Sequence, residues 1–282
     1  RPRDPAAAGK IEVLCQEAWT YHGSAPTDRV GQGVAAVPDL DGDGCDEAAF
    51  GAYLEESGAN SAEGVVRVVL GWGPNCAHAS PVGWTLDSEV ANSNAGWALA
   101  SGGSVDGDGL ADLVIGGYNV APGLDGALGQ VWVVRGADLL ALGEPIPFTE
   151  GEPDEASVHP FGAYRITGLS PGSRFGRSVA LMPTSAGHRI VVGSPRSWLS
   201  GYPVAGAALV YAYDAAWDPV AGPLRPQLNF AGESERPLSE VGEHVFAGLQ
   251  PDGTPFLGVG AQYGNGDGLD HGAAYLVPYG GP

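Results

Sequence analysis

The sequence predicts an all-β fold, a β-propeller of four-stranded antiparallel blades, from three observations. Glycine is unusually frequent, with 46 of 282 residues, and 23 prolines add further turn signals. The chain is 44% hydrophobic and only 16% charged, so it can bury a core despite this glycine content. Four segments share one layout, and the second strand of each ends near Gly51, Gly116, Gly193 and Gly260. Regular repeats of short strands are typical of propellers.

Each repeat is expected to contain four strands in the same order. After the shared segment, a third strand follows a glycine turn, as in EGVVRVVLGWG from Glu63. A short fourth strand closes the unit, as in GWTLDSE from Gly83. Apolar and polar residues that alternate over a short run bounded by glycine predict a strand, and no helical periodicity appears. The repeats divide the chain into a partial unit, 8–30, and four units, 31–94, 95–172, 173–240 and 241–282.

The partial unit leaves two interpretations of how the ring closes. Its strands at Lys10–Cys15 and around Trp19 match the third and fourth strands of a repeat, whereas the chain stops after a third strand. In one interpretation the Trp19 strand completes the last blade, which leaves the Lys10–Cys15 strand spare. In the other, the chain is part of a larger propeller that other chains or segments complete. An insertion at 137–161 is predicted to be a solvated loop, with a binding loop as the alternative.

The strongest chemical signal is an acidic loop at 39–47. Carboxylates at its first, third and fifth positions can turn toward one cation, and the glycine at its sixth lets the backbone reverse so that the seventh carbonyl can join them. Ca²⁺ takes about six to eight oxygen ligands, whereas Mg²⁺ resists such complete dehydration, so the loop predicts a Ca²⁺ site. Its expected ligands are Asp39, Asp41, Asp43, Glu47 and the carbonyl oxygen of Cys45.

A second loop, 104–112, has the same frame with a serine in the first position. It keeps three carboxylates against four in the first loop, so we expect a second, weaker Ca²⁺ site. Its expected ligands are Ser104, Asp106, Asp108, Asp112 and the carbonyl oxygen of Leu110. An EF-hand is excluded because the twelfth position of the first loop is Phe50, where an acid is required. The third and fourth repeats have short turns at this place.

These motifs resemble the FG-GAP repeat of integrin α-subunit propellers, which also occurs in bacterial secreted proteins. Phe175-Gly176 matches the first element, and the second is represented by Gly51-Ala52-Tyr53, Gly116-Gly117-Tyr118 and Gly193-Ser194-Pro195. The resemblance implies a calcium-binding propeller, normally of seven blades, whose metal loops lie on the face away from the ligand surface. Glu47 and Ser104 depart from the family pattern, which usually has Asp at both positions.

The three cysteines predict one disulfide and one free thiol if the protein is exported. Cys45 lies in the first metal loop, and Cys76 lies in the loop between the third and fourth strands of the same blade. Both loops leave a four-stranded blade at the same end, so a Cys45–Cys76 disulfide is favoured. A Cys15–Cys45 disulfide is the alternative.

Composition and missing motifs limit the function. A net charge of −20 opposes binding to nucleic acid or to an anionic membrane surface, and no apolar run is long enough for membrane insertion. The six histidines are scattered, and no nucleophile motif or phosphate loop is present, so an enzyme is not expected.

We therefore expect a secreted or cell-surface, Ca²⁺-stabilised propeller that binds a protein partner as an adhesion or assembly module. One alternative is a lectin-like propeller that binds a glycan. Another is the non-catalytic portion of a secreted polysaccharide-active enzyme.

Overall fold

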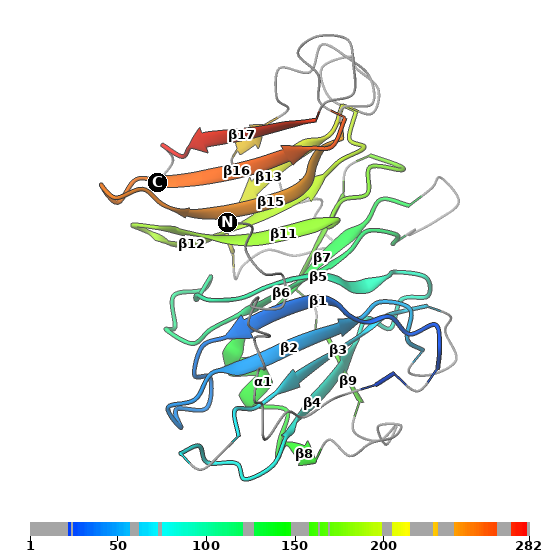
Figure 1. The fold of residues 1–282 in the computed structure, drawn as a ribbon, viewed down its shortest axis with the longest axis vertical. Coiled ribbons are helices and arrows are strands. Elements are labelled where there is room, and N and C mark those ends of the chain that lie inside the picture. Colours follow the sequence, from blue (N-terminus) through cyan, green and yellow to red (C-terminus); the bar gives the residue numbers. More distant parts are fainter. Residues whose placement is uncertain are drawn as a thin grey trace, which may run out of the picture.

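The computed structural model is built almost entirely of antiparallel β-sheets (Figure 1). It describes residues 22–23, 25–56, 62–72, 75–120, 127–147, 158–162, 164–168, 170–198, 205–214, 228–230, 240–263 and 272–280. The predicted strands at Lys10–Cys15 and around Trp19, and Cys15 itself, lie outside these residues. The all-β class is thereby confirmed.

The strands form four successive sheets, each built from consecutive stretches of the chain. Sheet I contains β1 (Val30–Val37), β2 (Glu47–Ala52), β3 (Val65–Val69) and β4 (Val82–Asp87). Sheet II contains β5 (Ala95–Ala100), β6 (Leu113–Gly117), β7 (Gln130–Val134) and β10 (Arg165–Thr167). Sheet III contains β11 (Ser178–Thr184), β12 (Gly187–Ser194), β13 (Ala207–Tyr211) and β14 (Leu228–Phe230). Sheet IV contains β15 (Val241–Leu249), β16 (Pro255–Ala261) and β17 (Ala273–Pro278).

This order confirms the predicted repeat of first, second, third and fourth strands in sheets I to III. Every pair of consecutive strands within these sheets is antiparallel, and the predicted fourth strands are found at β4, β10 and β14. The short turns expected in the third and fourth repeats are also present, because Thr184 pairs with Gly187 and Leu249 with Pro255.

The insertion at 137–161 differs from the predicted solvated loop. Its described residues include most of a short helix, α1 (Gly136–Leu140), and two edge strands, β8 (Ile146–Pro147) and β9 (Val158–Pro160), which pair with β4 of sheet I. Leu139 is fully buried, and the Phe161 ring packs edge-on against Trp132 at 5.3 Å between centroids. These apolar side chains, and the unpaired edge of β4, are the reason that the segment folds back onto the sheets.

Apolar side chains fill the space between each pair of neighbouring sheets. One core cluster lies between sheets I and II, a second between sheets II and III, and a third between sheets III and IV. The first strand of each sheet packs on the preceding sheet, so that β5 lies against β1, β11 against β5, and β15 against β11. Figure 1 shows these four strands following one another across the molecule.

Glycine allows the sheets to approach closely. A Cβ atom at Gly51 in β2 would overlap the carbonyl oxygen of Gly96 in β5. The same relation holds between the next sheets, at Gly116 with Gly176 and at Gly193 with Gly242. The second-strand glycines of the repeat are therefore required by packing between the sheets, and not only by turns.

A left-handed corner begins the first strand of every sheet. A non-glycine residue with positive φ is followed by an apolar residue and by a glycine with φ between 81° and 90°, namely Gly31, Gly96, Gly176 and Gly242. The non-glycine residues are Arg29, Asn94, Arg174 and Glu240, with φ values of 60°, 54°, 54° and 49°. A bulge follows in β1, β5 and β15.

The close approach predicts different costs for the same substitution in two sheets. Gly51→Ala places a methyl group against the backbone of β5, so we expect a loss of about 1–3 kcal/mol in the free energy of unfolding. Gly260→Ala, the equivalent change in sheet IV, meets its nearest atom at 3.5 Å and should be close to neutral. Urea unfolding followed by circular dichroism measures both. Equal losses in the two variants would contradict this packing.

Candidate metal centres

The acidic loop at 39–47 connects β1 to β2 at one end of sheet I. Carboxylate oxygens of Asp39, Asp41, Asp43 and Glu47 all lie within 4.8 Å of one another. Gly42 and Gly44 have φ values of 81° and 88°, which let the backbone curl around this cluster. The structure thus brings together the four side chains that were predicted as ligands.

The second loop brings together Asp106, Asp108 and Asp112 in the same way between β5 and β6. Ser104 joins them, since its Oγ lies 3.0 Å from Asp106 Oδ1 and 3.2 Å from Asp108 Oδ1. Arg135 Nη1 lies 4.0 Å from Asp106 Oδ2. This loop therefore has fewer carboxylates than the first, and the positively charged side chain of Arg135 lies beside it.

The two loops share their internal hydrogen bonds position by position. The residue at the fifth loop position donates its N–H to the carboxylate at the third position, as Asp43 does to Asp41 and Asp108 to Asp106, both at 3.1 Å. The residue at the seventh position donates its N–H to the carboxylate at the fifth position, as Cys45 does to Asp43 and Leu110 to Asp108, both at 2.8 Å. Backbone N–H groups thus hold the carboxylates in one conformation in both loops, before any ion is considered.

Cys45 and Leu110 are placed through these N–H groups. The role predicted for their carbonyl oxygens as ligands stays a prediction.

A buried carboxylate forms the floor of each loop. The N–H of Leu40 donates to Glu47 Oε2 at 2.6 Å, and the N–H of Val105 donates to Asp112 Oδ2 at 2.7 Å. The other oxygen of Asp112 accepts the N–H of Gly136 at 2.9 Å. Glu47 Oε1 is buried and has no hydrogen-bond partner among the residues that the structure describes. An unpartnered buried oxygen costs free energy unless a cation or a donor reaches it.

Burial controls the protonation of both floor residues. Loss of solvent raises the pKa of Glu47 to about 7, and the charges of Asp41 and Asp39 add to this effect against the hydrogen bond from Leu40. Loss of solvent likewise raises the pKa of Asp112 to about 6, opposed by the N–H groups of Val105 and Gly136. A bound cation would favour the ionised form of each.

A disulfide-linked segment covers the first loop. Cys45 is bonded to Cys76, as favoured from the sequence, so the alternative Cys15–Cys45 pairing is wrong. Next to Cys76, the N–H of Ala77 donates to Asp43 Oδ2 at 2.5 Å, and His78 Nε2 lies 3.1 Å from Asp41 Oδ2. The N–H groups of Ala77 and Cys45 lower the pKa of Asp43.

The contributions of Ala77 and His78 were not predicted. Their position beside Cys76 is the only signal in the sequence that leads to them, because the disulfide brings them to the loop.

No protein-family model matches this chain, and no curated protein sequence matches it. Within the described part of the chain, no helix has the length and apolar character needed to cross a membrane.

The raised pKa of Glu47 predicts how stability depends on pH in the absence of metal. The unfolded chain releases this proton near pH 4.5, whereas the folded protein keeps it until about pH 7. The folded state binds more protons in this range, so the contribution of Glu47 to stability falls as the pH rises from 4.5 to 7, by about 1.4 kcal/mol per pH unit at most.

Urea unfolding in a chelating buffer at pH 5 and pH 7.5 measures this loss. Glu47→Gln removes the titrating group and should flatten the dependence, apart from the smaller contribution of Asp112. A wild-type protein that gains stability over this range would contradict the raised pKa of the buried Glu47 carboxyl.

Proposed function

We propose that the protein is a calcium-stabilised, extracellular β-propeller that acts as a protein-binding adhesion or assembly module. The observation that carries the calcium role is the buried oxygen Glu47 Oε1, which has no hydrogen-bond partner within the described part of the chain. It belongs to a cluster with the carboxylates of Asp39, Asp41 and Asp43. The donors are hard oxygen atoms, which suit Ca²⁺, and the repeated loop geometry supports a second site. Asp39, Asp41, Asp43 and Glu47 would hold the first ion, and Ser104, Asp106, Asp108 and Asp112 the second.

The chemistry of a bound ion is structural in this proposal. Four carboxylates within one short loop repel one another, and a divalent cation neutralises part of that charge. The disulfide supports an extracellular location, since disulfides persist in oxidising compartments. It also fixes the covering segment whose Ala77 and His78 contact the carboxylates of Asp43 and Asp41.

The propeller arrangement is supported by the repetition of packing between successive sheets. Residues that face the next sheet are buried in the third strands of sheets I to III, where Val68, Val133 and Val210 are at most 2% exposed. The pairing of second and third strands places Leu276 of β17 at the equivalent position in sheet IV, and Leu276 is 71% exposed. Phe246 on the same face is 55% exposed. We propose that a further sheet of the same kind packs on this face.

Calcium binding is tested with two variants that each remove one negative charge. Asp41→Asn should weaken binding at the first site by about tenfold or more, because ligand charge sets affinity. Asp252→Asn is the matched control, since Asp252 lies in the corresponding turn of sheet IV and accepts the N–H of its near neighbour Thr254 at 2.9 Å. Calorimetric titration with Ca²⁺ measures both.

Thermal unfolding gives an independent measurement. Ca²⁺ at 100 times its dissociation constant should stabilise the folded protein by about 2.7 kcal/mol. If chelation leaves the Tm unchanged and Asp41→Asn titrates like the wild type, the calcium role is wrong.

The open face of sheet IV predicts self-association of this chain. Exposed apolar sheet surface associates, so sedimentation velocity should show concentration-dependent oligomers. The double variant Phe246→Lys with Leu276→Lys should stay monomeric. Val34→Lys alters an apolar residue that is 60% exposed in β1 and serves as the control. A wild-type chain that stays monomeric at all concentrations would contradict a sheet-binding face.

A further inference from the structure

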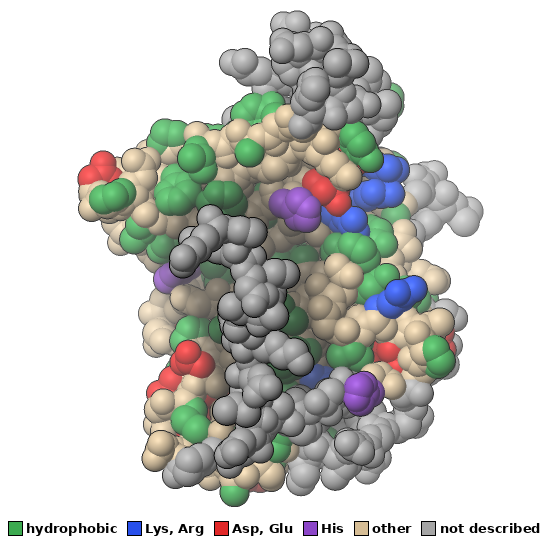
Figure 2. Space-filling model, viewed as in Figure 1, with side chains coloured by type: hydrophobic (Ala, Val, Ile, Leu, Met, Phe, Trp, Pro, Cys, Tyr) green, Lys and Arg blue, Asp and Glu red, His purple; other side chains and the backbone are tan. Residues whose placement is uncertain are grey.

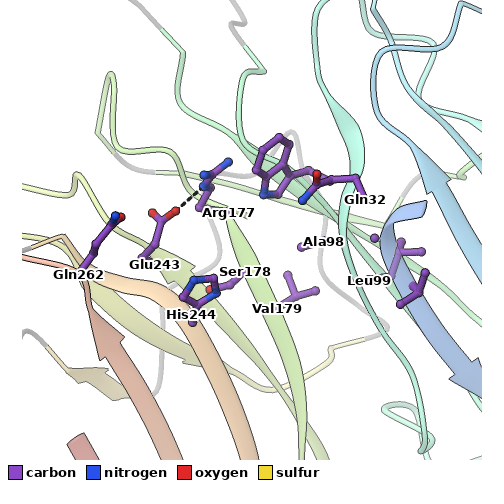
Figure 3. A pocket seen from close by; sticks show the side chains of 12 residues that line it. Gln32, Ala98, Leu99, Arg177, Ser178, Val179, Glu243, His244 and Gln262 are labelled. Atoms are coloured by element: carbon purple, nitrogen blue, oxygen red, sulfur yellow. Dashed lines mark hydrogen bonds and ion pairs between the residues drawn. The ribbon is translucent and has the colours of Figure 1, made fainter. Parts of the chain in front are cut away.

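Two adjoining hollows lie where the first strands of the sheets meet. The larger, of about 550 Å³, is lined by residues of β1, β5, β11 and β15, by Arg177 just before β11 and by Gln262. The smaller, of about 450 Å³, shares Arg177, Glu243 and Gln262 with it and adds Arg174 and Arg196. Figure 3 shows Arg177 and Glu243 paired on the wall of the larger hollow. Neither hollow contains a residue of the acidic loops at 39–47 and 104–112.

In these hollows the arginine side chains are more exposed than the glutamate side chains with which they pair. Arg177 Nε donates to Glu243 Oε1 at 2.9 Å, and Arg196 Nε donates to Glu240 Oε1 at 3.1 Å. Both glutamate side chains are 9% exposed, whereas the arginine side chains are 18% and 42% exposed. Both bonds use Nε, and no hydrogen bond of the terminal Nη groups of Arg177 or Arg196 is found among the residues that the structure describes, so these groups can bind a ligand. Figure 2 shows basic side chains gathered at one margin of this face.

Arg174 adds a charge that is not balanced within the hollow. Its side chain forms no ion pair with any residue that the structure describes, while the other two arginines each hold one glutamate. Three arginines against two glutamates give the smaller hollow a net charge of +1, in a chain whose total is −20. One carboxylate balances this charge, whereas a doubly charged phosphate would exceed it. The planar guanidinium also matches a carboxylate in two parallel hydrogen bonds.

Aromatic rings fix Arg177 in place before a ligand arrives. Its guanidinium lies 3.9 Å from the centroid of the Trp97 ring and 5.0 Å from that of Tyr118. Trp97 in turn packs edge-on against both Tyr53 and Tyr118. A side chain held in this way loses little conformational freedom when it binds, which favours affinity.

The larger hollow offers an apolar wall next to these cations. Val34, Leu99 and Val179 contribute to its lining, and Val34 is 60% exposed. A ligand that carries a carboxylate beside an aliphatic group would satisfy both hollows at once. An acidic residue followed by an aliphatic residue in a peptide has this chemistry, whereas an acidic sugar lacks the aliphatic side chain.

We propose that the paired hollows bind an acidic residue and its aliphatic neighbour in an exposed segment of a partner protein. The carboxylate binds at Arg174, Arg177 and Arg196, and the aliphatic side chain packs against Val34, Leu99 and Val179. This assignment rests on the proposed function as a protein-binding module, and it names the chemistry of the partner.

The test uses the full chain in Ca²⁺-containing buffer and fluorescently labelled, end-blocked peptides. Gly-Gly-Asp-Val-Gly-Gly is expected to bind. Gly-Gly-Asn-Val-Gly-Gly, which lacks the carboxylate, and Gly-Gly-Asp-Gly-Gly-Gly, which lacks the aliphatic side chain, should each bind at least about tenfold more weakly. Arg174→Gln should raise the Kd of the Asp-Val peptide by about tenfold. Arg29→Gln is the matched control, because Arg29 occupies the same left-handed corner in sheet I and lies outside both hollows.

Three outcomes would overturn the proposal. They are no preference for Asp over Asn, no measurable binding of any peptide, and equal effects of Arg174→Gln and Arg29→Gln. Displacement of the peptide by trigalacturonate with higher affinity than the peptide itself would assign the site to an acidic saccharide instead. Calcium titration of the same samples keeps the two proposals separate, because loss of calcium binding with intact peptide preference contradicts only the calcium role.

Discussion

The close approach of one sheet to the next through paired glycines is the constraint on which this architecture depends. The second-strand glycine of one sheet leaves room for the carbonyl group of a left-handed glycine in the next sheet, in three successive interfaces. The apolar clusters between sheets form around these contacts. The spacing is set by backbone atoms, so side chains at other positions vary from sheet to sheet while the packing stays the same. Sheet IV carries the same glycine, Gly260, at its open face.

Charge is organised at two levels in this acidic chain. In the two acidic loops at 39–47 and 104–112, backbone N–H groups hold carboxylates close together, and burial of Glu47 and Asp112 keeps their pKa values high. In the paired hollows the charge that faces the open space is positive, since buried glutamates hold more exposed arginines there. The loops lie at the β1–β2 and β5–β6 connections, whereas the hollows lie along the first strands. One fold thus presents clustered carboxylates and clustered arginines at separate places.

Much of this fold could be predicted because its signals are local. Alternating strands, repeated glycines and the Asp-x-Asp-Gly-Asp-Gly loop are properties of short sequence stretches, and the structure has strands and clustered carboxylates at those places. The features that were missed depend on contacts between distant residues. The strands β8 and β9 form because β4 has a free edge, and Ala77 reaches the first loop through the disulfide. The smaller hollow joins Arg174 and Arg177 at the start of sheet III with Arg196 after β12 and with Glu240 and Glu243 at the start of sheet IV, which no sequence spacing reveals.

The left-handed corner at the start of each sheet has a consequence for how such a surface can change. The same backbone conformation accepts Arg29, Asn94, Arg174 and Glu240, so neither charge nor side-chain length is fixed by the fold at this position. At least two of these residues, Arg174 and Glu240, line the smaller hollow. Evolution can therefore alter the charge of this surface one sheet at a time, by single substitutions that leave the glycine packing untouched. The corners serve as a set of variable positions on a constant frame, and related chains with the same sheets could differ widely in the partners they recognise.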